Sequence, residues 1–165
     1  MKKNRVLFLT QAALIAALYV VITVLGAAWS FGQVQIRLSE MLTILPVFTP
    51  AAIPGLFAGC LIGNILGGAV LPDIVFGSLA TLAAALLTYA LRRKSLVICC
   101  IPPIALNAAV VPFVLKYAYG VNLPIPFMML TVGAGELISA GVLGVLLGRV
   151  LKKNPRIFGA EVSQH

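Results

Sequence analysis

The sequence predicts an all-α integral membrane protein, a bundle of six transmembrane helices with both termini in the cytoplasm. Hydrophobic residues make up 61% of the 165 residues and charged residues only 10%. A soluble domain of this size could not bury so much apolar surface. Apolar runs of about twenty residues, the length that crosses roughly 30 Å of hydrocarbon as a helix, recur along the whole chain.

The basic residues lie between the apolar runs and indicate the orientation of the helices. By the positive-inside rule their clusters are cytoplasmic, so an even number of crossings separates each pair of clusters. Four crossings fit between the first cluster, at residues 2–5, and the second, at 92–94, and two more fit between the second and the third, at 149–156. The net charge of +8 thus reflects topology, and we expect no nucleic-acid partner. Ten of the twelve basic residues form the three clusters: Lys2, Lys3 and Arg5; Arg92, Arg93 and Lys94; Arg149, Lys152, Lys153 and Arg156.

The individual helices follow from the apolar runs and their breaks. The first run, from Val6 to Ala28, exceeds the roughly 7 to 15 apolar residues of a cleaved signal peptide, so we expect a retained helix. Three prolines, Pro46, Pro50 and Pro54, divide the next long run into two short helices. The predicted helices cover about 6–27, 40–49, 54–70, 73–91, 96–118 and 125–151, in one domain over 1–156 with a polar cytoplasmic tail at 157–165.

Small residues recur at intervals of four, a spacing that lets two helix backbones approach closely in lipid. In the third and sixth helices we interpret these stripes as packing within the bundle. The first helix carries two parallel stripes near its cytoplasmic end, and they suit either internal packing or the docking of a partner membrane protein. The stripes are Ala51, Gly55, Gly59, Gly63 and Gly67; Ala140, Gly144 and Gly148; Ala12 with Ala16; and Ala13 with Ala17.

Three of the four acidic residues, Glu40, Asp73 and Glu136, are embedded in apolar sequence. An ionised carboxylate costs several kcal/mol in a bilayer, so such a residue usually lines a ligand or ion path. Glu136 lies about eleven residues into its helix, roughly 16 Å below the outer end and close to the midplane, and we expect it to contact a ligand or an ion. Asp73 could instead cap its helix, and Glu40 could pair with Arg37.

Further polar and aromatic residues fall on the outer side of the predicted topology. The amides of Asn64 and Asn107 can donate and accept, which suits a purine edge or a hydrogen bond between helices. Trp29 and Phe31 precede the second helix and could cover a flat ligand. The remaining outer aromatic residues predict an interfacial belt. We therefore expect a cavity open to the outside, with Glu136 at its floor. The candidate substrate-binding residues are Glu136, Asn107, Asn64, Asp73, Glu40, Arg37, Trp29 and Phe31.

The motifs that are missing exclude several classes of protein. The sequence contains no GxxxxGK[ST] phosphate loop, so this chain cannot power transport with ATP by itself. It contains no GxSxG or HExxH, and His165 as the single histidine excludes most general-base chemistry. Cys60, Cys99 and Cys100 lack metal-ligand spacing and are read as apolar fillers. We expect no catalytic residue, metal or cofactor, although an intramembrane enzyme using paired carboxylates remains an alternative.

Four segments resemble the QueT family: RLSEMLTILP at 37–46, GLFAGCLIGN at 55–64, DIVFGSLATLAAAL at 73–86 and PPIALNAAVV at 102–111. Members of that family are S-components, the substrate-binding subunits of energy-coupling factor (ECF) transporters, and import precursors of the modified nucleoside queuosine. The resemblance implies the six-helix S-component fold in the bacterial cytoplasmic membrane. It also implies an ABC-type importer completed by a transmembrane coupling protein and two ATPase subunits, with the alanine stripes of the first helix as the docking motif.

The resemblance further implies a 7-deazaguanine ligand, such as queuine, which is flat and carries N–H donors and a basic amine. A carboxylate can accept two parallel hydrogen bonds, so Glu136 suits the ring edge. Asn107 and Asn64 suit the carbonyl and ring nitrogens, and Asp73 or Glu40 suits the amine. The alternatives are an S-component for another flat vitamin such as riboflavin or thiamine, a small proton-coupled exporter that uses Glu136, and a structural subunit that binds no ligand.

Overall fold

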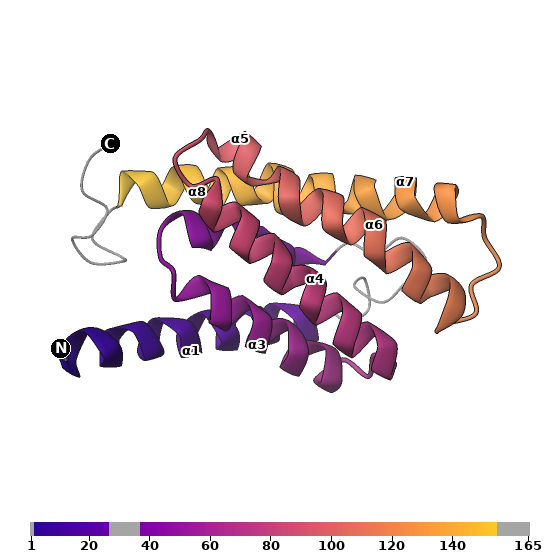
Figure 1. Cartoon of the computed structure of the whole chain (residues 1–165), viewed down its shortest axis with the longest axis horizontal. Coiled ribbons are helices and arrows are strands. Elements are labelled where there is room, and N and C mark those ends of the chain that lie inside the picture. Colours follow the sequence, from indigo (N-terminus) through magenta and orange to yellow (C-terminus); the bar gives the residue numbers. More distant parts are fainter. Residues whose placement is uncertain (1, 27–36, 155–165) are drawn as a thin grey trace.

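A computed structural model describes residues 2–26 and 37–154, and every element within these ranges is a helix. Six helical segments follow one another in the predicted order (Figure 1). The predicted tail at 157–165 lies outside the described residues. The first four segments are α1 Lys2–Leu25, η1 Leu38–Val47, α3 Ala52–Leu66 and α4 Leu71–Ala90. The fifth consists of α5 Leu96–Cys99 and α6 Ile101–Tyr117. The sixth is the continuous run of α7 Ile125–Glu136, η2 Leu137–Leu143 and α8 Gly144–Lys153.

The helical segments differ in length. Four of them are long and apolar enough to cross a membrane: Asn4–Leu25, Leu71–Ala90, Leu96–Tyr117 and Ile125–Lys153. The other two, η1 and α3, have 10 and 15 residues and extend only about 20 Å each. Six helices are thus confirmed in the described part of the chain. Six complete crossings, and the cytoplasmic location of both termini, stay predictions.

The short helix η1 lies inside the bundle. It contacts α1, α3, α4, α8 and η2, and its residues Glu40 and Ile44 are each about 1% exposed. The sequence predicted a helix here at 40–49, and the structure forms a tighter 3₁₀-helix. Its hydrogen bonds span three residues at both ends, as in Phe48 N–H to the Leu45 carbonyl at 2.9 Å. Pro46 has no N–H to donate to the carbonyl four residues earlier, which disfavours the α form.

The glycine stripe of α3 packs against α1. A Cβ atom on Gly55 would lie 2.7 Å from the carbonyl oxygen of Ala12, and one on Gly59 would lie 2.7 Å from the Tyr19 Cβ. Only glycine therefore permits this approach without a shift of the two helices. The prediction that this stripe serves packing within the bundle is confirmed.

The two alanine stripes of α1 have different surroundings. Ala12 and Ala16 lie at the contact with α3, since their backbone atoms are those that Gly55 and Gly59 approach. Ala13 and Ala17 are exposed. Docking of a partner on these alanines stays a prediction, and the Ala13 and Ala17 pair is the part of the motif that a partner can reach.

The small residues of the last helix also serve packing within the bundle. A Cβ atom on Gly148 would lie 3.1 Å from Leu96 side-chain atoms and 3.3 Å from Ile44, while one on Gly144 would lie 3.6 Å from the Met41 carbonyl oxygen. These contacts join α8 to η1 and to the short helix α5. The central position of η1 therefore depends on small residues.

Helix boundaries depart from the predictions where backbone chemistry requires it. Helix α3 ends at Leu66, four residues early, because Gly68 adopts the left-handed conformation with φ of +76° that terminates helices. The fifth helix is interrupted at Cys100, since Pro102 and Pro103 have no N–H to continue the ladder. Directly after Glu136 the last helix widens into the π-helix η2, a feature that is frequent at functional sites.

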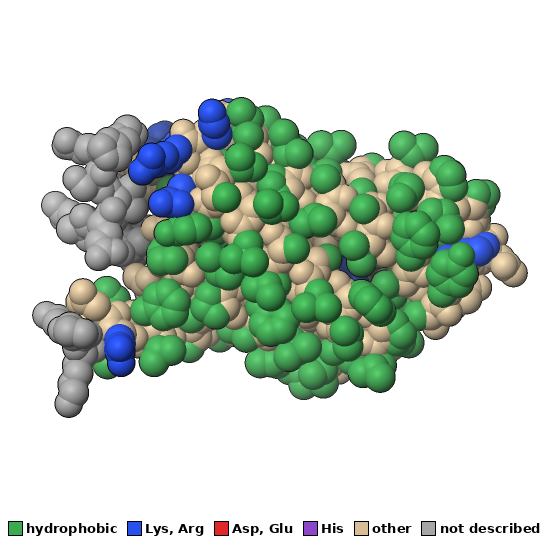
Figure 2. All heavy atoms as spheres, viewed as in Figure 1, with side chains coloured by type: hydrophobic (Ala, Val, Ile, Leu, Met, Phe, Trp, Pro, Cys, Tyr) green, Lys and Arg blue, Asp and Glu red, His purple; other side chains and the backbone are tan. Residues whose placement is uncertain are grey.

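The surface of the bundle agrees with a membrane environment. Figure 2 shows a largely hydrophobic face on which Lys and Arg gather at the end where α1 begins and α8 ends. No acidic side chain of the described residues is visible on this face, because Glu40, Asp73 and Glu136 are buried. Together with the apolar spans, this distribution identifies the chain as an integral membrane protein.

The α1–α3 contact gives the first testable prediction. We expect Gly59→Ala to lower the free energy of unfolding by about 1 to 2 kcal/mol, because overpacking outweighs the better helix propensity of alanine. Gly133→Ala is the matched control, since its Cβ would meet Ala108 at an ordinary 3.6 Å, and it should be neutral or stabilising. Thermal unfolding in detergent measures the change of stability in each of the two variants. Equal effects of the two substitutions would contradict the packing argument.

Candidate binding site

Six of the eight predicted site residues lie in the described part of the chain, and all six are buried. Their exposed fractions are between 0% and 5%. They come from the turn before η1 and from η1, α3, α4, α6 and α7. Trp29 and Phe31 lie outside the described residues. We call the following set the polar cluster: Arg37, Glu40, Asn64, Asp73, Asn107 and Glu136.

One part of the polar cluster is an ion pair. Arg37 Nη2 donates to both carboxylate oxygens of Asp73, at 3.2 and 3.0 Å, and Tyr119 Oη donates to Asp73 Oδ2 at 3.0 Å. Two alternatives from the sequence are therefore wrong. Asp73 does not cap α4, whose N-cap residue is Val70, and Arg37 forms its ion pair with Asp73 instead of Glu40. The first turn of a helix still favours the negative charge of Asp73.

Asn64 joins α3 to α4 next to this ion pair. Its Nδ2 donates to the Asp73 carbonyl oxygen at 3.4 Å and to Cys60 Sγ at 3.6 Å. The Thr81 hydroxyl also donates to Cys60 Sγ, at 3.4 Å. A Cβ atom on Gly77 would lie 3.1 Å from Asp73 Oδ1 and 3.3 Å from Asn64 Nδ2, so glycine leaves room for both groups. Hydrogen bonding between helices thus describes Asn64 better than ligand contact does.

The other part of the polar cluster contains two carboxyl groups, Glu40 and Glu136, and the amide of Asn107. Asn107 Nδ2 donates to Glu136 Oε1 at 2.9 Å. Tyr19 Oη donates to Glu40 Oε1. The second oxygens, Glu40 Oε2 and Glu136 Oε2, are buried without a hydrogen-bond partner among the described residues.

This second part of the cluster has the chemistry of a donor-binding site. A buried carboxylate oxygen without a partner is costly, and two nearby carboxylates repel each other in a low dielectric. A ligand that brings N–H donors or a positive charge would satisfy both oxygens. The sequence did not indicate that two carboxyl groups converge. The packing of η1 against η2, which begins directly after Glu136, brings the Glu40 and Glu136 helices together.

Two tyrosines of the site were missed by sequence reasoning. Tyr19 is only 1% exposed, and a tyrosine in the middle of a predominantly apolar helix was a usable signal, because buried tyrosine hydroxyls need partners. Tyr119 was assigned to the interfacial belt, yet its hydroxyl reaches Asp73 and accepts from Val70 N–H at 3.3 Å. Partial burial, followed by the Asp73 charge, raises the pKa of Tyr119 above its ordinary value.

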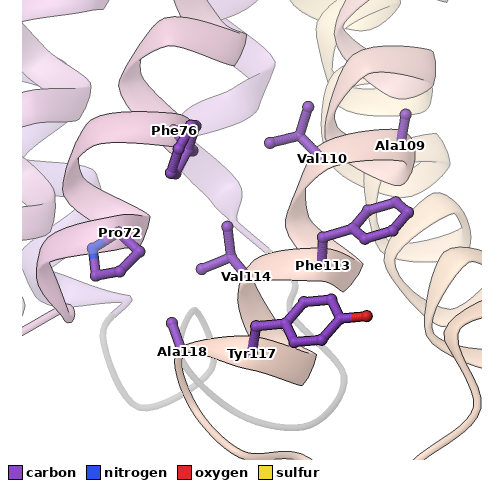
Figure 3. Close-up of a pocket in the computed structure, with 8 residues that line it drawn as sticks. All are labelled: Pro72, Phe76, Ala109, Val110, Phe113, Val114, Tyr117 and Ala118. Atoms are coloured by element: carbon purple, nitrogen blue, oxygen red, sulfur yellow. The ribbon is translucent and has the colours of Figure 1, made fainter.

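A separate apolar groove lies between α4 and α6. Pro72 and Phe76 of α4 face Val110 and Val114 of α6 across it (Figure 3), and its volume is about 490 Å³. All of its lining side chains are apolar or aromatic, and none belongs to the polar cluster. The groove therefore suits a hydrocarbon chain such as that of a lipid, whereas polar recognition is confined to the polar cluster.

Comparisons with known proteins agree with these features. The family model described as QueT transporter matches residues 9–153. A curated protein of Lactococcus lactis subsp. cremoris (strain MG1363), named Queuosine precursor transporter QueT, is 37% identical over 84 residues. The match covers 50% of this chain and 49% of that protein, so the chain spans about half the length of this curated relative. No solved structure matches the chain.

The ion pair gives the second prediction. Asp73→Asn removes the carboxylate that balances the buried Arg37 guanidinium, and we expect it to lower the free energy of unfolding by about 3 to 5 kcal/mol. Tyr119→Phe is the control, because it removes one hydrogen bond to the same carboxylate and keeps the ion pair, at a cost of about 1.5 to 3 kcal/mol. Chemical denaturation in detergent compares the two. A larger loss for Tyr119→Phe would contradict the central role of the ion pair.

Proposed function

Because the chain belongs to the QueT transporter family, we propose that it is the S-component of an ECF-type importer and captures a queuosine precursor outside the cell. The name of the curated relative supports this substrate class. The observation that carries the proposal is the pair of buried, unpartnered oxygens, Glu40 Oε2 and Glu136 Oε2, with Asn107 bound to Glu136. A transporter family also argues against the paired-carboxylate enzyme.

A 7-deazaguanine such as queuine has the donors that this pair requires. Its ring edge presents a ring N–H beside an exocyclic amino group, and its side chain carries a basic amine. We assign the ring edge to Glu136, with Asn107 available for the carbonyl or a ring nitrogen. The amine is assigned to Glu40, because Asp73 already accepts from Arg37 and Tyr119. The earlier assignment of Asn64 to the ligand is replaced by its structural role between α3 and α4.

Transport then requires partners. The sequence lacks a phosphate loop, so ATP hydrolysis falls to two ATPase subunits, connected through a transmembrane coupling protein. The exposed Ala13 and Ala17 of α1 support docking of that protein, because small residues let a second helix approach closely in lipid. The proposed mechanism is a reorientation of the whole bundle in the membrane, driven by the ATPases.

A proton-coupled exporter is the second candidate, and the buried Glu136 with one unpartnered oxygen favours it. This candidate makes a separate demand on the chain. The purified protein, reconstituted alone in vesicles, would have to transport substrate when a pH gradient is the driving force. Uptake that needs the coupling protein and the ATPases contradicts it.

Ligand titration gives the third prediction. We expect the purified protein to bind queuine or one of its two simpler 7-deazaguanine precursors with a submicromolar Kd in isothermal titration calorimetry. Glu136→Gln should weaken this binding at least about a hundredfold, because the amide cannot accept two parallel hydrogen bonds and carries no charge. The matched control is Glu161→Gln, the same substitution in the predicted polar tail at 157–165, which should leave the Kd unchanged.

The same titration decides between substrates. Guanine, riboflavin and thiamine serve as competing ligands. Tight binding of riboflavin or thiamine with no binding of any deazaguanine would reassign the chain to another vitamin. Folded protein that binds none of these ligands would contradict capture of a queuosine precursor.

Docking gives the fourth prediction. Ala13→Leu combined with Ala17→Leu should abolish co-purification with the coupling protein and the ATPases, while the Kd for the ligand changes less than about threefold, because both residues are exposed and lie away from the polar cluster. Ala105→Leu with Ala109→Leu is the matched control, a second pair of exposed alanines four residues apart, on α6. Loss of the complex in both double variants would contradict a specific role of α1.

A further inference from the structure

Helix α1 reaches the candidate site through one side chain. Tyr19 is 1% exposed, and its hydroxyl donates to Oε1 of Glu40. One turn further along α1, Thr23 Oγ1 donates to Ser39 Oγ at 2.8 Å. Among the described residues, two side-chain hydrogen bonds thus connect α1 to η1, and of these the bond of Tyr19 ends on a residue of the polar cluster.

The position of Tyr19 is set by close packing. Gly59 of α3 faces it, and a Cβ atom at Gly59 would lie 2.7 Å from the Tyr19 Cβ. Gly55, one turn earlier on α3, makes an equally close approach to the Ala12 carbonyl oxygen. The Tyr19 ring therefore has little room to move away from η1 while α1 and α3 stay in contact.

The hydrogen bond from Tyr19 gives the two carboxylate oxygens of Glu40 different roles. Oε1 accepts from Tyr19, and Oε2 is the oxygen without a partner among the described residues. A carboxylate held by one oxygen keeps a single orientation, so the other oxygen meets a ligand without losing further rotational freedom. On Glu136, Asn107 has the corresponding role, because its Nδ2 donates to Oε1 and leaves Oε2 without a partner.

We propose that Tyr19 is a positioning residue for substrate recognition, which orients Glu40 so that Oε2 meets the amine of the ligand. This inference rests on the proposed function and adds a residue and a basis for selectivity to it. Tyr19 does not touch the ligand in this scheme. It determines how strongly the site prefers a ligand with a protonated amine over a neutral ligand with the same ring.

The test compares two ligands that share the 7-deazaguanine ring. The 7-aminomethyl compound carries the amine, and the 7-cyano compound carries a neutral nitrile in its place. In Tyr19→Phe we expect the Kd of the aminomethyl compound to rise about tenfold, which is the size expected for one hydrogen bond to a charged group. The Kd of the cyano compound should rise less than about threefold. Isothermal titration calorimetry of the full chain in detergent measures the ratio of the two Kd values.

Matched variants separate positioning from general stability. Thr23→Val removes the neighbouring hydrogen bond between α1 and η1 and should leave the ratio unchanged. In a Glu40→Gln background, Tyr19→Phe should change the ratio less than threefold, because the two residues act as a pair. Gly59→Ala keeps every polar group but displaces Tyr19, and it should lower the preference for the amine, whereas Gly133→Ala, whose Cβ would meet Ala108 at an ordinary 3.6 Å, should not.

The outcomes are distinguishable. An equal loss of affinity for both ligands in Tyr19→Phe, or an equal change of the ratio in Thr23→Val, would overturn the positioning role. If Tyr19→Phe does not fold, the comparison of Gly59→Ala with Gly133→Ala decides, and equal ratios in those two variants overturn the proposal. Failure of the unmodified protein to bind either ligand would instead contradict the proposed function.

Discussion

A polar group that faces hydrocarbon has no solvent to bind, and this constraint decides where the charged residues of the bundle lie. Arg37, Glu40, Asp73 and Glu136 are all at most 5% exposed. The remaining described basic residues lie mainly at one end of the bundle (Figure 2). Because η1 brings Glu40 to the centre and follows directly on Arg37, the enclosure of this short helix by its neighbours is what lets the polar cluster form.

Within the cluster, the carboxylate oxygens without a partner lie in one part. Arg37, Asp73, Tyr119 and Asn64 bind one another and tie together the start of η1, the ends of α3 and α4 and the loop after α6. The carboxyl groups of Glu40 and Glu136 each retain one unpartnered oxygen. A purely structural network would be expected to satisfy its buried acceptors, so the unsatisfied half is where a ligand contributes most.

Helix α1 combines functions that are usually assigned to different elements. One face packs on the glycines of α3 and supplies Tyr19 to the site. The opposite face exposes Ala13 and Ala17. A partner that binds this second face touches the same helix that orients Glu40. The close contact of α1 with α3 therefore matters for the site as well as for stability, since it limits how far Tyr19 can move.

The sequence by itself determined the class of protein, the order and approximate limits of six helices, the inward glycine stripe of α3 and six residues of the polar cluster. These features depend on local hydropathy, proline positions and residue spacing, all of which are readable along the chain. The pairings were decided only by the tertiary structure. Arg37 and Asp73 are 36 residues apart, and Asn107 and Glu136 are 29 apart, so helix packing selects these partners, whereas local spacing left an Arg37–Glu40 pair as one of two open interpretations of Glu40. The role of Tyr19 likewise appears only when α1, α3 and η1 meet, because its partner lies 21 residues away on another helix.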